Sequence, residues 1–276
     1  MKIEDYAPQE PLTEQGAGYK AVTLYLSSRV PAGEEFAYGD DPCQRLIVHP
    51  AAKPNGTVLA FTFGGGWTNG YKEMMSFMAP SLNAAGVTFV TFGYRLAPQH
   101  LFPVGWMDAA RTLQWLHANV ARWGGDPKRL FVGGHSAGAH YAALLATRRD
   151  WQAGLGLPAD VVRGALPISG IYWFGEGSGL SMRPRFLGPA EAGNDVAASP
   201  GMHLAPPPPP MLLAHGSEDF PHLCAQAERF ERELRGAGGD VERVVLPGRN
   251  HFTACYAAGE ADGPWAARAI AWMAAR

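Results

Sequence analysis

The sequence predicts an α/β fold in which a mostly parallel central sheet carries helices on both faces. Short apolar runs that suit buried strands alternate with longer segments whose apolar residues recur at helical spacing. In addition, 47% of the 276 residues are hydrophobic, and no long polar or low-complexity break divides the chain. A chain of this length and composition buries a large core, so we expect a single domain over residues 1–276.

The N-terminal part predicts the entry to the sheet. Residues 1–18 are polar and rich in Pro, Gly and Gln, which predicts a loose lead-in that lies over the surface. Residues 21–26 alternate in polarity and, with residues 44–48, suit edge strands. These two strands would be the antiparallel start of the sheet, and residues 50–56 would turn the chain into the next strand.

The middle of the chain predicts parallel strands joined by helices. Residues 58–63 and 87–92 are nearly all apolar, as expected of strands that are covered on both faces. Apolar residues recur at helical spacing over 106–123, where two glycines end the pattern. Residues 130–132 are then the central strand, and the alanine-rich run 139–147 is the helix that follows it.

The C-terminal part continues this alternation. Residues 211–214 predict a buried strand, and apolar residues at steps of four, three and four over 223–234 predict a helix. Residues 244–246 supply the last strand.

Residues 171–205, rich in Gly, Pro and small side chains, predict a small variable cap that roofs the site. The five prolines at 206–210 are either a stiff lead into the next strand, which we favour, or a polyproline ligand for a partner domain.

Residues 134–138 read Gly-His-Ser-Ala-Gly and lie between the predicted central strand and its helix. In this context a G-x-S-x-G sequence forms a sharp elbow that presents the serine, Ser136, at the carboxyl edge of the sheet. The flanking glycines remove Cβ atoms that would clash with the neighbouring strand and helix. The pattern therefore predicts Ser136 as a nucleophile.

Three glycines, Gly64 to Gly66, follow the strand at 58–63, one strand–helix–strand unit before the serine. An isolated triple glycine indicates only a flexible loop, but this position favours an oxyanion hole, in which amide N–H groups stabilise a developing negative charge. We expect Gly65, Gly66 and Ala137 to supply those amides, or Gly64 if the loop is shifted by one residue.

Several motifs together resemble the α/β-hydrolase superfamily, and within it the kynurenine formamidase (arylformamidase) branch and the related hormone-sensitive-lipase-like carboxylesterases. The matching stretches are Phe-Gly-Gly-Gly-Trp at 63–67, Tyr-Arg-Leu-Ala-Pro at 94–98, Gly-Asp-Pro at 125–127 and Gly-His-Ser-Ala-Gly-Ala-His at 134–140. Two features depart from the formamidase pattern. Phe63 replaces the usual histidine before the glycines, and aromatic residues follow Ser-Gly-Ile-Tyr at 169–172 where an acid is common.

The resemblance implies a catalytic order of serine, acid and histidine. Asp219 follows the strand at 211–214, and its spacing to Pro221 and Gln226 matches the family better than Glu218 does. His251 follows the last strand, where the general base of this fold belongs. For His135 and His140 we expect packing or supporting hydrogen bonds, and for the other histidines no role.

Four aromatic residues are candidates to stack on a planar acyl or leaving group, although at least half of them would otherwise belong to the core. They are Trp67, Tyr172, Trp173 and Phe174.

Charge and composition exclude several partners. The net charge is -2 without a clustered basic face, so we expect neither nucleic acid nor an anionic membrane as partner.

Residues 1–6 contain acids where a signal peptide needs an apolar stretch, which predicts a cytoplasmic protein. Three widely spaced cysteines and the histidine spacings predict no disulfide framework, no metal and no cofactor. The sequence leaves a homodimer open.

The motifs together predict a serine hydrolase that cleaves a small ester or an aryl amide, such as a formamide, through an acyl-enzyme intermediate. In this hypothesis His251 takes the proton of Ser136, and Asp219 orients the imidazole. Two alternatives stay open at this point: a peptidase of the same fold, and a non-catalytic protein that binds small molecules on a hydrolase scaffold.

Overall fold

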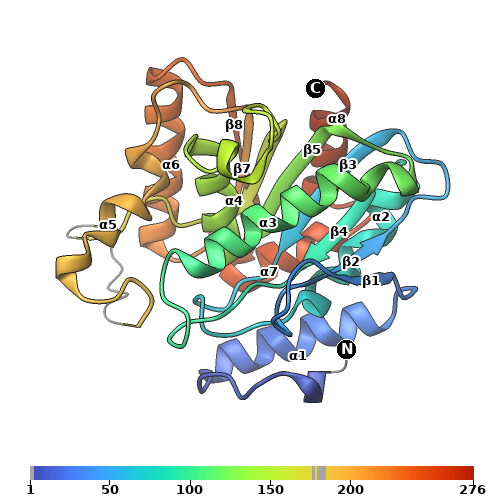
Figure 1. The fold of residues 1–276 in the computed structure, drawn as a ribbon, viewed down its shortest axis with the longest axis horizontal. Helices are drawn as coiled ribbons and strands as arrows, with labels where there is room; N and C mark the ends of the chain where they lie inside the picture. Colours follow the sequence, from blue (N-terminus) through green and yellow to red (C-terminus); the bar gives the residue numbers. More distant parts are fainter. Residues whose placement is uncertain (1–2, 176–177, 179–184) are drawn as a thin grey trace.

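The computed structural model describes residues 3–175, 178 and 185–276, and its centre is an eight-stranded sheet (Figure 1). The strand order is β1-β2-β4-β3-β5-β6-β7-β8, and only the pairings of β1 with β2 and of β2 with β4 are antiparallel. The predicted α/β class with a mostly parallel sheet is therefore confirmed. The strands are β1 (Glu34–Ala37), β2 (Arg45–His49), β3 (Gly56–Thr62), β4 (Thr88–Phe92), β5 (Gly125–His135), β6 (Gly164–Ile168), β7 (Met211–Glu218) and β8 (Val241–Asn250).

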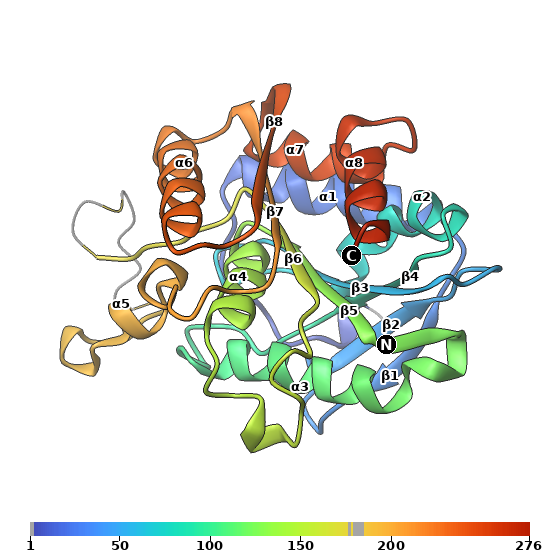
Figure 2. The same cartoon turned by 90° about the horizontal axis from the view of Figure 1, so that it is seen from above.

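Helices cover both faces of the sheet. In Figure 2, α3, α4 and α6 lie on one face, and α2 and α8 lie on the other. The helices are α1 (Glu14–Ser28), α2 (Ala79–Ala84), α3 (Val104–Asn119), α4 (Ala137–Thr147), α5 (Asn194–Ala197), α6 (Pro221–Gly236), α7 (His251–Tyr256) and α8 (Pro264–Ala274). A 3₁₀-helix, η2 (Lys72–Met78), precedes α2.

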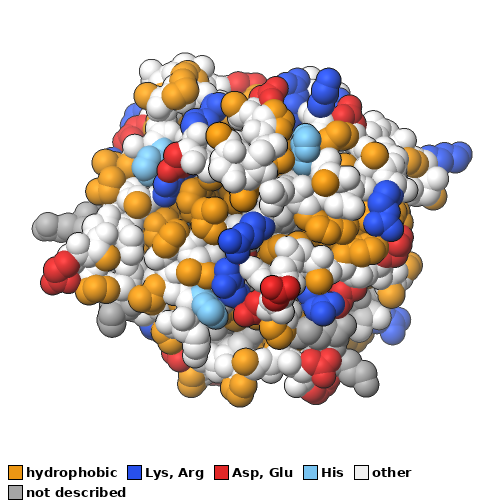
Figure 3. Space-filling model, viewed as in Figure 1, with side chains coloured by type: hydrophobic (Ala, Val, Ile, Leu, Met, Phe, Trp, Pro, Cys, Tyr) orange, Lys and Arg blue, Asp and Glu red, His pale blue; other side chains and the backbone are white. Residues whose placement is uncertain are grey.

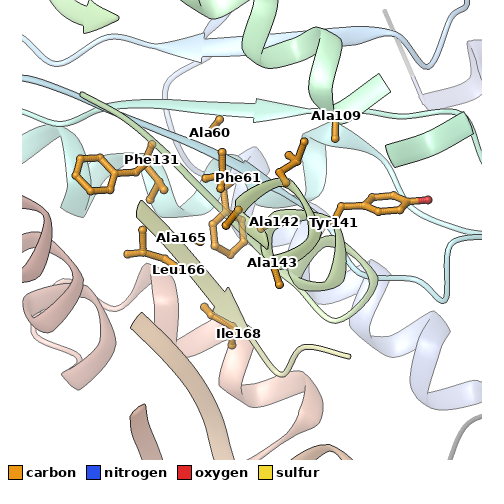
Figure 4. Close-up of a cluster of buried hydrophobic side chains, with 14 of the residues drawn as sticks. Ala60, Phe61, Ala109, Phe131, Tyr141, Ala142, Ala143, Ala165, Leu166 and Ile168 are labelled. Carbon is orange, nitrogen blue, oxygen red and sulfur yellow. The ribbon is translucent and has the colours of Figure 1, made fainter. Parts of the chain in front are cut away.

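The core lies where the central strands meet α3 and α4 (Figure 4). Side chains of β3, β5 and β6 are almost completely buried there, among them Phe61, Phe131 and Leu166. The helix α4 is buried along its whole length. Small residues such as Ala142 and Ala143 let this helix approach the sheet closely. The central strands therefore form a rigid base for the residues at their carboxyl ends.

The prediction of an edge strand at residues 21–26 was wrong, because this stretch belongs to the helix α1. Residues 14–18 begin the same helix, so the predicted loose lead-in also differs from the structure there. Thr13 caps α1 by accepting a hydrogen bond from the amide of Gly16, and Tyr19 and Thr23, one turn apart, face the core. The alternation that suggested a strand places Val22 and Tyr25 in solvent instead. Packing of α1 against η2 decides the conformation.

The predicted cap, residues 171–205, is described only in part, since residues 176–177 and 179–184 lie outside the described residues. The described part contains α5 and packs on the body of the protein, where the ring of Phe186 stacks on that of Trp67 at 4.3 Å between centroids.

The surface carries charges of both signs. Acidic and basic side chains are interspersed on the face seen in Figure 3, in agreement with the small net charge. Within the described residues, every helix is too short or too polar to cross a membrane.

Candidate active site

Ser136 stands at a sharp bend between β5 and α4. Its backbone angles, φ 54° and ψ −116°, are rare for a residue with a side chain, and they turn Oγ out of the sheet. A Cβ atom on Gly134 would lie 2.3 Å from the carbonyl carbon of Gly138, and one on Gly138 would lie 2.5 Å from the carbonyl oxygen of Thr62. Both flanking glycines are therefore required by the close contact of helix and strands.

The structure brings together the three residues that the sequence predicted as nucleophile, base and acid. The Nε2 atom of His251 lies 3.0 Å from Ser136 Oγ, and its Nδ1 atom lies 2.8 Å from Oδ1 of Asp219. His251 is the first residue of α7, and Asp219 follows β7, so all three lie at the carboxyl edge of the sheet. Asp219 and His251 are buried, and Ser136 is partly exposed.

Two further donors hold Asp219. The hydroxyl of Ser169 donates to Oδ2, and the amide of Phe220 donates to Oδ1 at 2.7 Å. Burial raises the pKa of Asp219, but the hydrogen bond and charge of His251, followed by the hydroxyl of Ser169, outweigh burial and lower that pKa to about 2. Asp219 therefore stays ionised. Ser169 follows β6 and has a φ of 54°. The sequence placed Ser169 in a stretch that resembles the family but did not predict its bond to Asp219.

His135 supports His251 through a hydrogen bond to its backbone. Its Nε2 atom lies 2.8 Å from the carbonyl oxygen of His251, and because a carbonyl only accepts, Nε2 carries the proton. Nδ1 then accepts the hydroxyl proton of Tyr19 at 3.0 Å. Burial, and then the charge of His251, lower the pKa of His135 to about 3, so the imidazole is neutral. This agrees with the supporting hydrogen bond expected of His135, but Tyr19 was missed because its helix was not predicted.

The glycine loop is held by backbone contacts and by the N-terminal segment. A Cβ atom on Gly65 would lie 2.0 Å from the carbonyl oxygen of Asn69, which requires glycine there. The side chain of Gln9 forms two hydrogen bonds of 2.9 Å with the backbone of Gly70. Phe63, which replaces a histidine in this loop, stacks on Tyr94 at 4.6 Å. The loop is thus anchored without that histidine.

The amides predicted to stabilise an oxyanion stand beside Ser136. Gly64 touches the elbow, since a Cβ atom on it would lie 2.8 Å from Ser136 Cβ. Gly66 has a positive φ of 61°. Among the hydrogen bonds of the described residues, none uses the amides of Gly65, Gly66 or Ala137. These donors are available to a ligand.

A pocket of about 250 Å³ opens in front of Ser136. Its floor includes the glycine loop, the elbow and His251, whereas its outer wall comes from residues 11–20, in the N-terminal segment and α1. Figure 1 shows α1 at the bottom of the view, below α7, which begins with His251. Of the described residues in the predicted cap, only Arg185 lines the pocket. Residues 11–20 therefore supply a wall that was not predicted, and the part of the expected cap at 176–177 and 179–184 lies outside the described residues.

The four aromatic residues predicted for the substrate pocket do not line it. Trp67, Tyr172, Trp173 and Phe174 are at most 8% exposed and belong to the core. Tyr172 stacks on Phe230 of α6 at 4.1 Å. The physical reason is size, because large rings beside a rigid sheet bury more area inside the fold than at a pocket wall. The alternative that they pack in the core is correct.

His140 fixes Trp67 in that core. Its Nε2 atom lies 2.6 Å from the carbonyl oxygen of Ala198, and its Nδ1 atom accepts from Nε1 of Trp67 at 3.1 Å. Burial lowers the pKa of His140 to about 4. His49 and His215, for which no role was expected, are also buried, and they bond Ser76 and Arg243 respectively.

The described part of the chain contains no cluster of His, Cys, Asp and Glu that could hold a metal ion. Its three cysteines are free thiols. Burial raises the pKa of Cys43 and of Cys255 to about 12, so neither is a reactive thiolate.

Comparisons with known proteins identify relatives. A sequence profile described as alpha/beta hydrolase fold matches residues 59–254. The esterase LipC of Mycobacterium tuberculosis is 33% identical over 238 residues, which are 78% of this chain and 58% of that protein. The isoprenylcysteine alpha-carbonyl methylesterase of Arabidopsis thaliana is 28% identical over 252 residues, which are 84% of this chain and 58% of that protein. The chain thus spans less than two thirds of either relative.

Among solved structures, a hyperthermophilic esterase from the archaeon Pyrobaculum calidifontis is similar in fold. The TM-score is 0.75 at 20% identity, and the match covers 95% of this chain and 90% of that chain.

Proposed function

The chain belongs to the α/β-hydrolase fold family, as its motifs predicted, and from this premise we propose that it is a serine hydrolase that cleaves small carboxylic esters. The observation that carries the proposal is the hydrogen-bonded line from Ser136 through His251 to Asp219. Nucleophile, base and acid within hydrogen-bond reach are what acyl transfer through a serine needs.

In the first step, Nε2 of His251 takes the proton of Ser136 as Oγ attacks the carbonyl carbon of the ester. Asp219, bonded to Nδ1, fixes the tautomer that leaves Nε2 free to accept, and it stabilises the imidazolium that forms. The negative charge on the carbonyl oxygen is received by the amides of Gly65, Gly66 and Ala137. Each donor of this kind contributes about 3 kcal/mol to the transition state.

Collapse of this intermediate releases the alcohol, which takes the proton from His251, and leaves the acyl group on Ser136. His251 then activates a water that attacks the acyl carbon. The carboxylic acid product leaves while Ser136 regains its proton. Both half-reactions use the same oxyanion donors, so one site serves the whole cycle.

Two observations favour a small ester as the substrate. The pocket volume of about 250 Å³ lies just below the usual range for ligand sites, which begins at about 300 Å³, and this small size suits short acyl groups. The relatives named above are esterases. Hydrolysis of an aryl formamide, which the resemblance implied, stays a second prediction, and a panel that includes N-formylkynurenine beside 4-nitrophenyl esters tests it.

Ser136→Ala tests the proposal directly. We expect turnover of 4-nitrophenyl butyrate to fall roughly 10⁴-fold or more, with unchanged folding and loss of labelling by a fluorophosphonate probe. Ser28→Ala, which removes an exposed hydroxyl on α1, is the matched control and keeps both activity and labelling. Retained turnover in Ser136→Ala contradicts the assignment, and absence of labelling in the native protein favours a binding protein instead.

A further inference from the structure

The described lining of the pocket in front of Ser136 contains basic side chains but no acidic ones. Its described lining includes Lys20 and Arg185, whereas no Asp or Glu side chain lines it. The amides of the glycine loop and the side chains of Thr68 and Asn69 add further hydrogen-bonding groups. This basic lining contrasts with the net charge of -2 of the whole chain.

Lys20 reaches the pocket from one face of α1. Thr13, Gly16, Tyr19 and Lys20 all line the pocket, and steps of three and four residues place them on the same side of the helix. The ammonium of Lys20 lies 4.8 Å from the centre of the Tyr71 ring and 3.4 Å from its hydroxyl. The ring of Tyr71 therefore attracts the ammonium through a cation–π contact, but it supplies no negative charge that would neutralise the ammonium.

The other cations near this site have partners. Arg185 pairs with Glu10 at 2.9 Å, and the buried Lys72 pairs with both Glu35 and Glu73. For Lys20, the described residues provide no carboxylate within ion-pairing distance. A half-buried ammonium in a pocket gains most from an anion that arrives with the ligand, because partial burial strengthens the attraction beyond its value in open water.

We propose that Lys20 selects esters that carry a carboxylate, on the acyl group or on the leaving group, and binds that carboxylate while Ser136 attacks the ester carbonyl. This inference rests on the proposed function and names the substrate class of the same site. Lys20 is a specificity-determining residue here, and it takes no part in the proton transfers between Ser136 and His251.

The test compares esters that differ only in this charge. On the acyl side, 4-nitrophenyl hemisuccinate is paired with 4-nitrophenyl methyl succinate. On the leaving side, 4-acetoxybenzoate is paired with its methyl ester. The measured quantity is the ratio of kcat/KM for the anionic over the neutral member of each pair. Because the enzyme concentration cancels in this ratio, a partly misfolded variant does not distort it.

We expect Lys20→Gln to lower the ratio about fivefold for one of the two pairs, and that pair identifies the side that carries the carboxylate. Lys20→Glu lowers the ratio further, since it adds repulsion. Salt at about 0.5 M lowers the ratio of the native enzyme but not that of Lys20→Gln. Lys53→Gln, which removes an exposed lysine far from the pocket lining, leaves the ratio unchanged.

Equal ratios for the native enzyme and Lys20→Gln on both pairs overturn the inference. If the native protein hydrolyses none of the four esters and Ser136 resists a fluorophosphonate, the proposed function fails, and calorimetric titration with glutarate then tests the anion site alone. In that case weaker binding of glutarate to Lys20→Gln supports the carboxylate site, and equal binding or no binding to both proteins refutes it.

Discussion

Tyr19→Phe removes one hydroxyl and keeps the ring that packs against Phe252 and Tyr256. The lost hydroxyl is the donor to Nδ1 of His135, which in turn donates to the carbonyl oxygen of His251. The change therefore acts through His135 on His251, the proposed general base, which is the first residue of α7. Tyr19 is a positioning residue in this reasoning.

The size of the effect follows from burial. Tyr19 and His135 are at most 5% exposed, so in the variant Nδ1 of His135 is a buried acceptor without a donor. Such a group destabilises a fold by about 1 to 2 kcal/mol. For a protein of this size that loss lowers Tm by about 4 °C. Since the backbone of His251 is held less firmly, we expect kcat to fall about fivefold while KM changes less than about twofold.

Thermal unfolding and steady-state kinetics with 4-nitrophenyl butyrate measure the two effects. Tyr25→Phe is the matched control, because Tyr25 lies on the same helix with its side chain in solvent, 64% exposed. We expect this control to keep both Tm and kcat. If Tyr19→Phe behaves as Tyr25→Phe does, the hydrogen bond to His135 does not position His251. If it raises KM alone, Tyr19 acts only as a pocket wall.

Two further predictions concern buried polar groups. Ser169→Ala removes a donor to Asp219, so we expect the pKa of Asp219 to rise from about 2 toward its usual value and kcat and kcat/KM to fall together, about tenfold; a change in KM alone contradicts this. Burial lowers the pKa values of His49 and His140 from 6.5 to about 4. The unfolded chain then takes up protons that the folded protein excludes, so stability that is present above pH 6.5 is lost as the pH falls toward 4, about 3 kcal/mol per histidine. Urea unfolding at pH 7 and pH 4.5 measures this loss, and equal midpoints refute it.

The carboxyl edge of the sheet was predictable because its signals are local. Each of these features comes directly after an apolar strand in the sequence, namely the elbow around Ser136, the residue His251 and the glycines at 64–66. Their order along the chain then brings them together, since parallel strands end at the same edge.

The outer wall of the pocket was not predictable in the same way. The helix α1 has little amphipathic pattern, and its alternation over 21–26 favoured a strand. Contacts with η2, and the burial of Tyr19 against residues more than 100 positions later, determine its place. The aromatic residues Trp67 and Tyr172 show a related limit, because a large apolar side chain near a site serves the core as well as a pocket.

The wall formed by residues 11–20 precedes the stretch that matches the family, residues 59–254, in which Ser136, Asp219 and His251 all lie. The three residues and this wall of the pocket therefore come from separate parts of one chain. A substitution within residues 11–20 changes the wall of the pocket and leaves Ser136, Asp219 and His251 in place. The shape of the pocket can therefore be altered without any change in the central sheet that holds these three residues.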